Sequence, residues 1–217
     1  MTRALITWGG WPGHEPDKVA ALFADMLQAE GMEVTVTDSL ACFDDSAALS
    51  NLSLIVPVWT MSTITKDQAQ NVADAVAGGV GLAGCHGGMC DAFRTEVIWQ
   101  FLTGSQWVAH PGNDGVNYRV RMLGDDPLIA GIGDFDVSTE QYYLHVDPAV
   151  RVHAVCDFPV VEGPHTVNGP VAMPVGYTKG WGNGRVYYNA LGHQANVIDH
   201  GPAREMVRRG LIWAAQS

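Results

Sequence analysis

Three histidines are the residues of this sequence best placed to do chemistry. His14 follows the apolar run at 4–8, His86 follows the run at 80–85, and His193 follows the segment RVYYNALG. Neutral imidazoles that converge in one pocket can bind a divalent metal or transfer a proton. A single histidine in a loop is more often a satisfied structural residue. The presence of a histidine after each of three strand-like runs nevertheless favours a shared site.

The segment VGLAGCHGGMCDAFR carries the most specific of these histidines. An apolar strand-like run ends in Cys85-His86-Gly87-Gly88 and then takes on a helical pattern. The glycines permit a sharp strand-turn-helix elbow, which displays one side chain beside the positive end of the following helix. Adjacent side chains leaving a strand point to opposite sides, so we expect Cys85 to be buried and inert. We expect His86 to be the functional residue and to make few core contacts.

The first half of the chain alternates strand-like and helix-like segments. Strands are expected at 4–8, 32–37, 52–59 and 80–85, and helices at 17–30, 65–77 and 89–103. Thr65 is of the residue type preferred as a helix N-cap, and Phe93, Val97 and Phe101 are expected on one helix face. Such alternation indicates a parallel sheet covered on both sides by helices. Sites in these sheets lie beyond the carboxyl ends of the strands, where the three histidines are placed.

The second half of the chain has a different pattern. Between 107 and 175 the strand-like pieces, among them VNYRVRML and VHAVCDF, are short and separated by Pro, Gly and Asp. They indicate antiparallel strands added to the sheet or an inserted β section. Residues 172–190 are typical of a hairpin that turns at KGWGNG, and 202–215 of a final helix with Pro near its start.

Length, composition and charge limit the class of protein. A chain of 217 residues with 47% hydrophobic and 16% charged residues fits one folded domain over 1–217. A net charge of −11 argues against nucleic acid or an anionic membrane as the main partner. No apolar run approaches the roughly 20 residues that span a bilayer, and the first residues do not resemble a secretory signal. We therefore expect a cytoplasmic protein. Its cysteines form no CxxC pair and are expected to be free: Cys42, Cys85, Cys90 and Cys156.

The segments GGWPGHEP, GxHGGMCDAFR, EQYY and KGWGNGRVYYNALGH resemble those of the trehalose-utilisation (ThuA-like) family, over nearly the whole chain. That family is similar to the class I glutamine amidotransferases. The resemblance implies an α/β fold with a flavodoxin-like, doubly wound, mostly parallel sheet and added antiparallel strands. It also implies a role in carbohydrate metabolism without defining the reaction.

The amidotransferase catalytic pattern is not preserved. In those enzymes the elbow reads GxCxG, with a cysteine nucleophile and a later histidine and acid as partners. Here His86 takes the nucleophile position, and Gln194 and Ala195 follow His193 without supplying the acid. We therefore predict that the protein is not a glutaminase.

The positions and types of the residues lead to a set of candidate site residues. His86 and His193 are predicted to be catalytic, and His14, His86 and His193 to be the ligands if a divalent metal such as zinc is bound. No HxH or HExxH spacing fixes a metal geometry, and no nucleotide cofactor is predicted. The substrate is expected to be a small carbohydrate. Its predicted contacts are Trp11, His110, Glu140 and Tyr142.

Each of these assignments has a structural alternative. The aromatic residues could belong to the core, His110 could be a turn residue, and Glu140 could lie at a strand edge. Asp91 and Arg94 are expected to form a solvated pair at a helix start. For the whole protein two functions stay open: an enzyme acting on a sugar or oxidised sugar derivative, and a noncatalytic small-molecule binding or partner subunit. The sequence also leaves open whether the chain forms a homo-oligomer.

Overall fold

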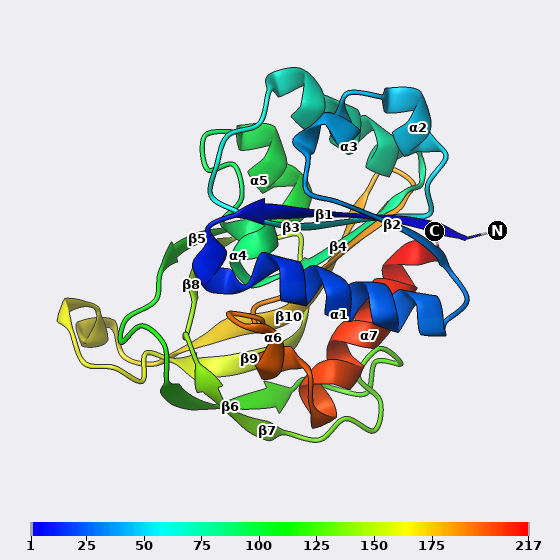
Figure 1. Ribbon diagram of the computed structural model, residues 1–217. Coiled ribbons are helices and arrows are strands. Elements are labelled where there is room, and N and C mark those ends of the chain that lie inside the picture. The colour runs from blue at the N-terminus through cyan, green and yellow to red at the C-terminus, as the bar shows by residue number, and fades with distance from the viewer. Residues whose placement is uncertain (1, 217) are drawn as a thin grey trace.

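The computed structural model describes residues 2–216 and contains one large sheet flanked by helices (Figure 1). Its strands are β1 Arg3–Gly10, β2 Glu33–Thr37, β3 Leu54–Thr60, β4 Gly81–Cys85, β5 Ser105–Ala109, β6 Val116–Met122, β7 Phe135–Thr139, β8 Tyr143–Val146, β9 Arg151–Phe158, β10 Val171–Trp181 and β11 Gly184–Asn189. Its α-helices are α1 Pro16–Ala29, α2 Ser46–Ser50, α3 Lys66–Gly78, α4 His86–Cys90, α5 Val97–Thr103, α6 Ala195–Ile198 and α7 Gly201–Ala215. The short 3-10 turns are η1 Pro12–His14, η2 Leu40–Phe43 and η3 Pro164–Asn168.

The large sheet has a parallel part and an antiparallel part. Its strand order is β2-β1-β3-β4-β11-β10-β9-β6-β7. The first five strands in this order are mutually parallel, and the remaining four continue the sheet with antiparallel pairings. Strands β5 and β8 form a separate antiparallel pair. The predicted fold, a doubly wound sheet with added antiparallel strands, is confirmed.

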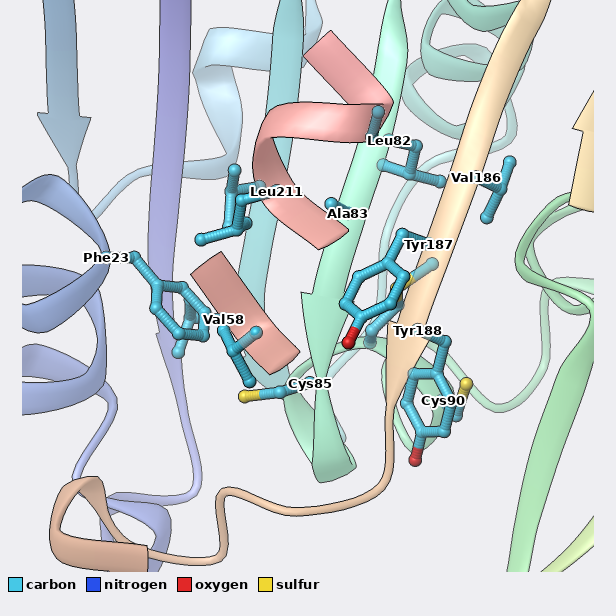
Figure 2. Close-up of a cluster of buried hydrophobic side chains, with 14 of the residues drawn as sticks. Phe23, Val58, Leu82, Ala83, Cys85, Cys90, Val186, Tyr187, Tyr188 and Leu211 are labelled. Atoms are coloured by element: carbon cyan, nitrogen blue, oxygen red, sulfur yellow. The ribbon is translucent and has the colours of Figure 1, made fainter. Parts of the chain in front are cut away.

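Helices cover both faces of the parallel part. Helices α1 and α7 lie on one face, and α3 and α5 lie on the other (Figure 1). The core between α1, α7 and the sheet contains Phe23 and Leu211, both buried (Figure 2). Tyr187 of β11 is buried beneath α7 and donates a hydrogen bond to the Met206 carbonyl oxygen at 3.0 Å. Burial of this continuous apolar layer fixes the positions of the strand ends.

Most of the expected elements of the parallel part are present. Helix α3 begins with a capping box in which Thr65 caps the backbone and Gln68 bonds back to the Thr65 nitrogen. The hairpin of β10 and β11 and the final helix α7 also match their predicted segments.

The predicted helix at 89–103 is wrong. Helix α4 ends at Cys90, and the chain makes a tight turn before α5 begins at Val97. Phe93 has φ 50° and is fully buried against Trp99, whereas Val97 and Phe101 are 75% and 58% exposed. The helix is interrupted because burial of Phe93 in a left-handed turn prevails over the helical pattern.

Two other features of the described chain concern membrane-spanning helices and disulfide bonds. No helix within residues 2–216 has the length and apolar character needed to cross a membrane. All four cysteines are free, as predicted, and Cys85, Cys90 and Cys156 are buried.

Candidate active site

His14 is held at the carboxyl end of β1 by a loop that is tied to β3. The Trp11 nitrogen donates to the Thr60 carbonyl oxygen at 3.2 Å, and a Cβ on Gly10 would lie 2.0 Å from the same oxygen. Only glycine permits this approach of the two backbones. The His14 Nδ1 atom then lies 2.7 Å from the Thr60 hydroxyl, so the ring is fixed with its Nε2 atom directed inward.

His86 lies at the elbow between β4 and α4, as predicted. Its φ of 47° is in the left-handed region, which costs a residue with a side chain about 1–2 kcal/mol. The Tyr188 hydroxyl donates to the His86 carbonyl oxygen at 3.3 Å, and the Tyr142 ring stacks on the imidazole at a centroid distance of 3.8 Å. A Cβ on Gly87 would meet the His14 ring at 2.7 Å, so this glycine allows the two histidines to approach.

His193 and Glu140 complete the cluster from two other segments. His193 lies in the loop after β11, and Glu140 lies between β7 and β8. The Tyr118 hydroxyl donates to the Glu140 carbonyl oxygen at 3.0 Å and so fixes this segment beside the elbow. The acid that does not follow His193 in the sequence is thus supplied by a distant part of the chain.

A single carboxylate oxygen lies among three imidazoles. Glu140 Oε2 is 3.1 Å from His86 Nε2, 3.3 Å from His193 Nδ1 and 3.9 Å from His14 Nε2. One ligand atom from each of these four residues lies within 4.8 Å of the others. All four side chains are buried, with exposed fractions of 7% or less. The structure therefore brings the three predicted histidines together around one acid.

The hydrogen bonds of His86 determine which of its nitrogens carries a proton. Its Nδ1 atom lies 2.8 Å from the Ala190 carbonyl oxygen, which can only accept, so Nδ1 is the donor. In a neutral imidazole the Nε2 atom then presents a lone pair to the Glu140 oxygen at 3.1 Å. Two facing acceptors repel each other unless a proton or a cation lies between them. His193 Nδ1 is also buried and lies 3.3 Å from the same Glu140 oxygen.

The pKa shifts indicate which residues of the cluster are charged and which are neutral. Burial and the neighbouring His86 and His193 lower the pKa of His14 to about 3. Burial also lowers the pKa of His86. Although burial alone would raise it, the adjacent His193 and His86 hold the pKa of the Glu140 carboxyl well below its usual range. Burial alone would lower the pKa of His193, but the adjacent Glu140 carboxylate raises it above its usual value. Near pH 7 the cluster thus contains an ionised Glu140 carboxylate and the neutral imidazoles of His14 and His86, and His193 is its most readily protonated imidazole.

A small cavity of about 180 Å³ opens onto this cluster. His14 and Glu140 are among its lining residues, and His110 contributes an Nδ1 atom 3.1 Å from Glu140 Oε1. Its remaining lining residues are Trp11, Met61, Asp91, Arg94, Trp107 and Tyr142. All four residues predicted to contact substrate lie here, although Glu140 lies at the centre of the histidine cluster rather than at the rim.

The trehalose-utilisation (ThuA) family model matches residues 3–214. The chain belongs to the ThuA family. A search of curated proteins found no match.

Solved structures similar to this ThuA-family protein share its fold at low sequence identity. A ThuA-like protein from Bacteroides uniformis is 16% identical, with a TM-score of 0.76 and coverage of 98% of this chain and 91% of that one. A ThuA-like protein from Parabacteroides merdae is 15% identical, with a TM-score of 0.72 and coverage of 100% and 90%. A β-galactosidase from Bacillus circulans sp. alkalophilus is 14% identical, with a TM-score of 0.62, and matches 99% of this chain over only 30% of its own.

Two expectations about the elbow of this ThuA-family protein have different outcomes. Cys85 is buried in the core, and burial raises the pKa of its thiol to about 12 (Figure 2). Its expected burial is therefore confirmed. The expectation that His86 makes few core contacts is wrong, because its side chain is 1% exposed and packs under Tyr142.

The assignment of Asp91 and Arg94 as a solvated pair at a helix start is also wrong. Asp91 is 2% exposed and directly follows α4, and Arg94 lines the cavity. Two further residues of the site, Thr60 and Trp107, were not predicted from the sequence. Thr60 could have been found as a polar residue at the carboxyl end of a buried strand, whereas Trp107 lies in a segment with no distinguishing pattern.

Proposed function

We propose that this ThuA-family protein is an enzyme of carbohydrate metabolism that acts on a sugar or oxidised sugar derivative at a divalent-metal centre. The observation that carries the proposal is the Nε2 atom of His86, which faces the ionised Glu140 carboxylate in a buried cluster. A cation between the two groups turns this repulsion into attraction. Family membership supports the carbohydrate role, because the family is described by trehalose utilisation.

The donor set fits zinc. His14, His86, His193 and Glu140 would hold the ion through three imidazole nitrogens and a carboxylate oxygen, all ligand types that zinc accepts. Donors about 2.0–2.1 Å from a tetrahedral zinc lie roughly 3.4 Å apart. The distances of 3.1, 3.3 and 3.9 Å around Glu140 Oε2 bracket this spacing. Metal-bound histidines commonly bond through their second nitrogen to a fixed partner, as His86 does with the Ala190 carbonyl oxygen.

A bound divalent ion would polarise a carbonyl or lower the pKa of a water. The residues of the chain supply the remaining functions. Glu140 balances positive charge at the centre, and His110, on its cavity side, is placed to hold or pass a proton between substrate and Glu140 Oε1. Trp11 and Tyr142 provide aromatic surfaces against which a sugar ring packs. The buried, protonated Cys85 thiol provides no nucleophile for glutamine hydrolysis.

We also propose that the protein acts in the cytoplasm on a small-molecule partner. Four free cysteines in one chain suit a reducing compartment. The net charge of −11 continues to argue against nucleic acid as a partner.

The decisive experiment measures metal content and sugar conversion in the same preparations. We expect the wild-type protein to retain about one zinc ion per chain, as a single centre requires, and to convert trehalose, glucose or one of their keto derivatives. His86→Ala should lose both properties. His153→Ala is the matched control, because His153 is also buried, at 3% exposed, but bonds Thr178 away from the cluster. A wild-type protein that takes up no divalent metal and converts no sugar would favour the noncatalytic binding subunit instead.

A further inference from the structure

The guanidinium group of Arg94 is fixed in the cavity wall while part of it is left unpaired. Its Nε and Nη2 atoms donate to the two carboxylate oxygens of Asp91 at 2.5 and 2.9 Å. Its central carbon lies 4.6 Å from the ring centroid of Trp107. Within residues 2–216 the Nη1 atom donates to no other group. The two N–H donors of Nη1 therefore remain available at a wall whose orientation is already set.

The backbone beneath this pair is held in a strained arrangement. Met61 and Ser62 have φ of 62° and 61°, and Phe93 has φ of 50°. The two turns are joined because the Met61 nitrogen donates to the Asp91 carbonyl oxygen at 2.9 Å and the Phe93 nitrogen donates to the Met61 carbonyl oxygen at 3.0 Å. Left-handed residues other than glycine concentrate at functional sites, where surrounding contacts hold them. Here they present the side chains of Asp91 and Arg94 to the cavity.

The size and the surfaces of the cavity limit what it can bind. At about 180 Å³ it is smaller than the 300–1,000 Å³ typical of pockets for drug-sized ligands, so it suits a single ring. Trp11 and Trp107 line it, and aromatic side chains commonly pack against the C–H surface of a sugar. The hydroxyl of Tyr142, a residue 4% exposed, has no hydrogen-bond partner within residues 2–216 and lies at the same cavity.

The charge of the wall distinguishes a neutral sugar from a sugar acid. Among residues 2–216, Arg94 is the only Lys or Arg side chain that lines the cavity, and Asp91 neutralises it through both carboxylate oxygens. A substrate carboxylate would meet no net positive charge at this pair, in a protein whose net charge is −11. Sugar hydroxyls need only the free N–H groups and the remaining lone pairs of the carboxylate.

We propose that Asp91, Arg94 and Trp107 form a subsite that binds the hydroxyl groups of a neutral sugar ring, with Arg94 as its specificity-determining residue. This inference rests on the proposed function, since it names the class of substrate that reaches the same centre.

The test compares sugar binding with zinc content in wild type, Arg94→Met and Arg94→Lys. The ligands tested are glucose, galactose, fructose, glucuronate and gluconate. Their binding is measured by ligand-observed NMR and by quenching of tryptophan fluorescence. We expect at least one neutral sugar to bind and both variants to weaken it by about tenfold or more, the loss expected for hydrogen bonds from a charged group. Lysine is not expected to rescue binding, because it lacks the planar donor pair that stacks on Trp107.

Arg121→Met is the matched control. Arg121 is also paired with an aspartate, Asp157 at 2.6 Å, and is 39% exposed against 42% for Arg94, but it lies on β6 outside the cavity. This variant should bind sugar as the wild type does. The inference is overturned if no neutral sugar binds, if a sugar acid binds more tightly than every neutral sugar, or if Arg94→Met binds sugar unchanged. If the proteins retain zinc in these cases, the proposed metal centre is still supported. Absence of zinc from the wild type would contradict the metal proposal itself.

Discussion

The parallel and antiparallel parts of this protein contribute different chemistry to one site. The parallel strands β1, β4 and β11 end close to His14, His86 and His193. The segments around the antiparallel strands supply Glu140, His110 and Tyr142. One part therefore places imidazole nitrogens, and the other adds the negative charge and the wall that faces substrate.

The difference follows from how each part is held. Ends of buried parallel strands meet at one edge of the sheet, so residues distant in sequence converge there as a consequence of topology. The topology of the parallel strands does not determine the position of Glu140 at this edge. Glu140 is positioned by particular contacts, among them the Tyr118 hydrogen bond to its backbone. The site depends on the antiparallel part for its only carboxylate among the four clustered ligands.

The largest expected effect comes from removing that carboxylate charge. Glu140→Gln keeps the shape of the side chain but leaves three imidazoles without an anion, so zinc affinity should fall by more than about 100-fold, the upper range for loss of an outer partner. Competition with a zinc chelator measures this change. Glu162→Gln, at an exposed glutamate before η3, is the control. Unchanged zinc affinity in Glu140→Gln would mean that the histidines of the parallel part suffice alone.

A second prediction concerns the segment that joins the two parts. Phe93→Ala should lower the free energy of unfolding by about 3–5 kcal/mol, because it empties a fully buried site. Phe101→Ala should cost less than about 1 kcal/mol, since Phe101 is 58% exposed. Urea denaturation followed by circular dichroism measures both values. Similar decreases in the free energy of unfolding for the two variants would instead support the uninterrupted helix predicted from the sequence.

The contrast between the parts also explains what could be predicted from the sequence. Apolar runs and caps such as Thr65 depend on local physics, so the strands and helices of the parallel part were predictable. The convergence of His14, His86 and His193 followed from topology. The break at Phe93 and the central position of Glu140 depend on long-range packing, which no local pattern records. The pairing of Asp91 with Arg94 was visible as a spacing, but its burial was not.

A smaller effect is expected from the outer partner of His14. Thr60→Val removes the hydroxyl 2.7 Å from His14 Nδ1 and should weaken zinc binding by about 10–100-fold, because the ring loses its fixed orientation. Thr178→Val is a close control, since the Thr178 hydroxyl lies 2.8 Å from Nε2 of the buried His153 in the antiparallel part. Both variants should lose some stability, but only Thr60→Val should change zinc affinity. Equal zinc affinities would show that His14 is held by packing alone.

The smallest expected effect is a pH dependence that arises in the antiparallel part. Burial lowers the pKa of His153 from its usual 6.5, an effect opposed by Asp126 and reinforced by Arg151. The folded state therefore binds this proton less readily than the unfolded state. The stability contributed by neutral His153 is present above about pH 6.5 and is lost as the pH falls below it. One group changes the free energy of unfolding by at most about 1.4 kcal/mol per pH unit. Denaturation between pH 7.5 and 5 should thus show a shallower decline for His153→Gln than for the wild type. Parallel declines would assign the acid sensitivity to the clustered histidines of the parallel part.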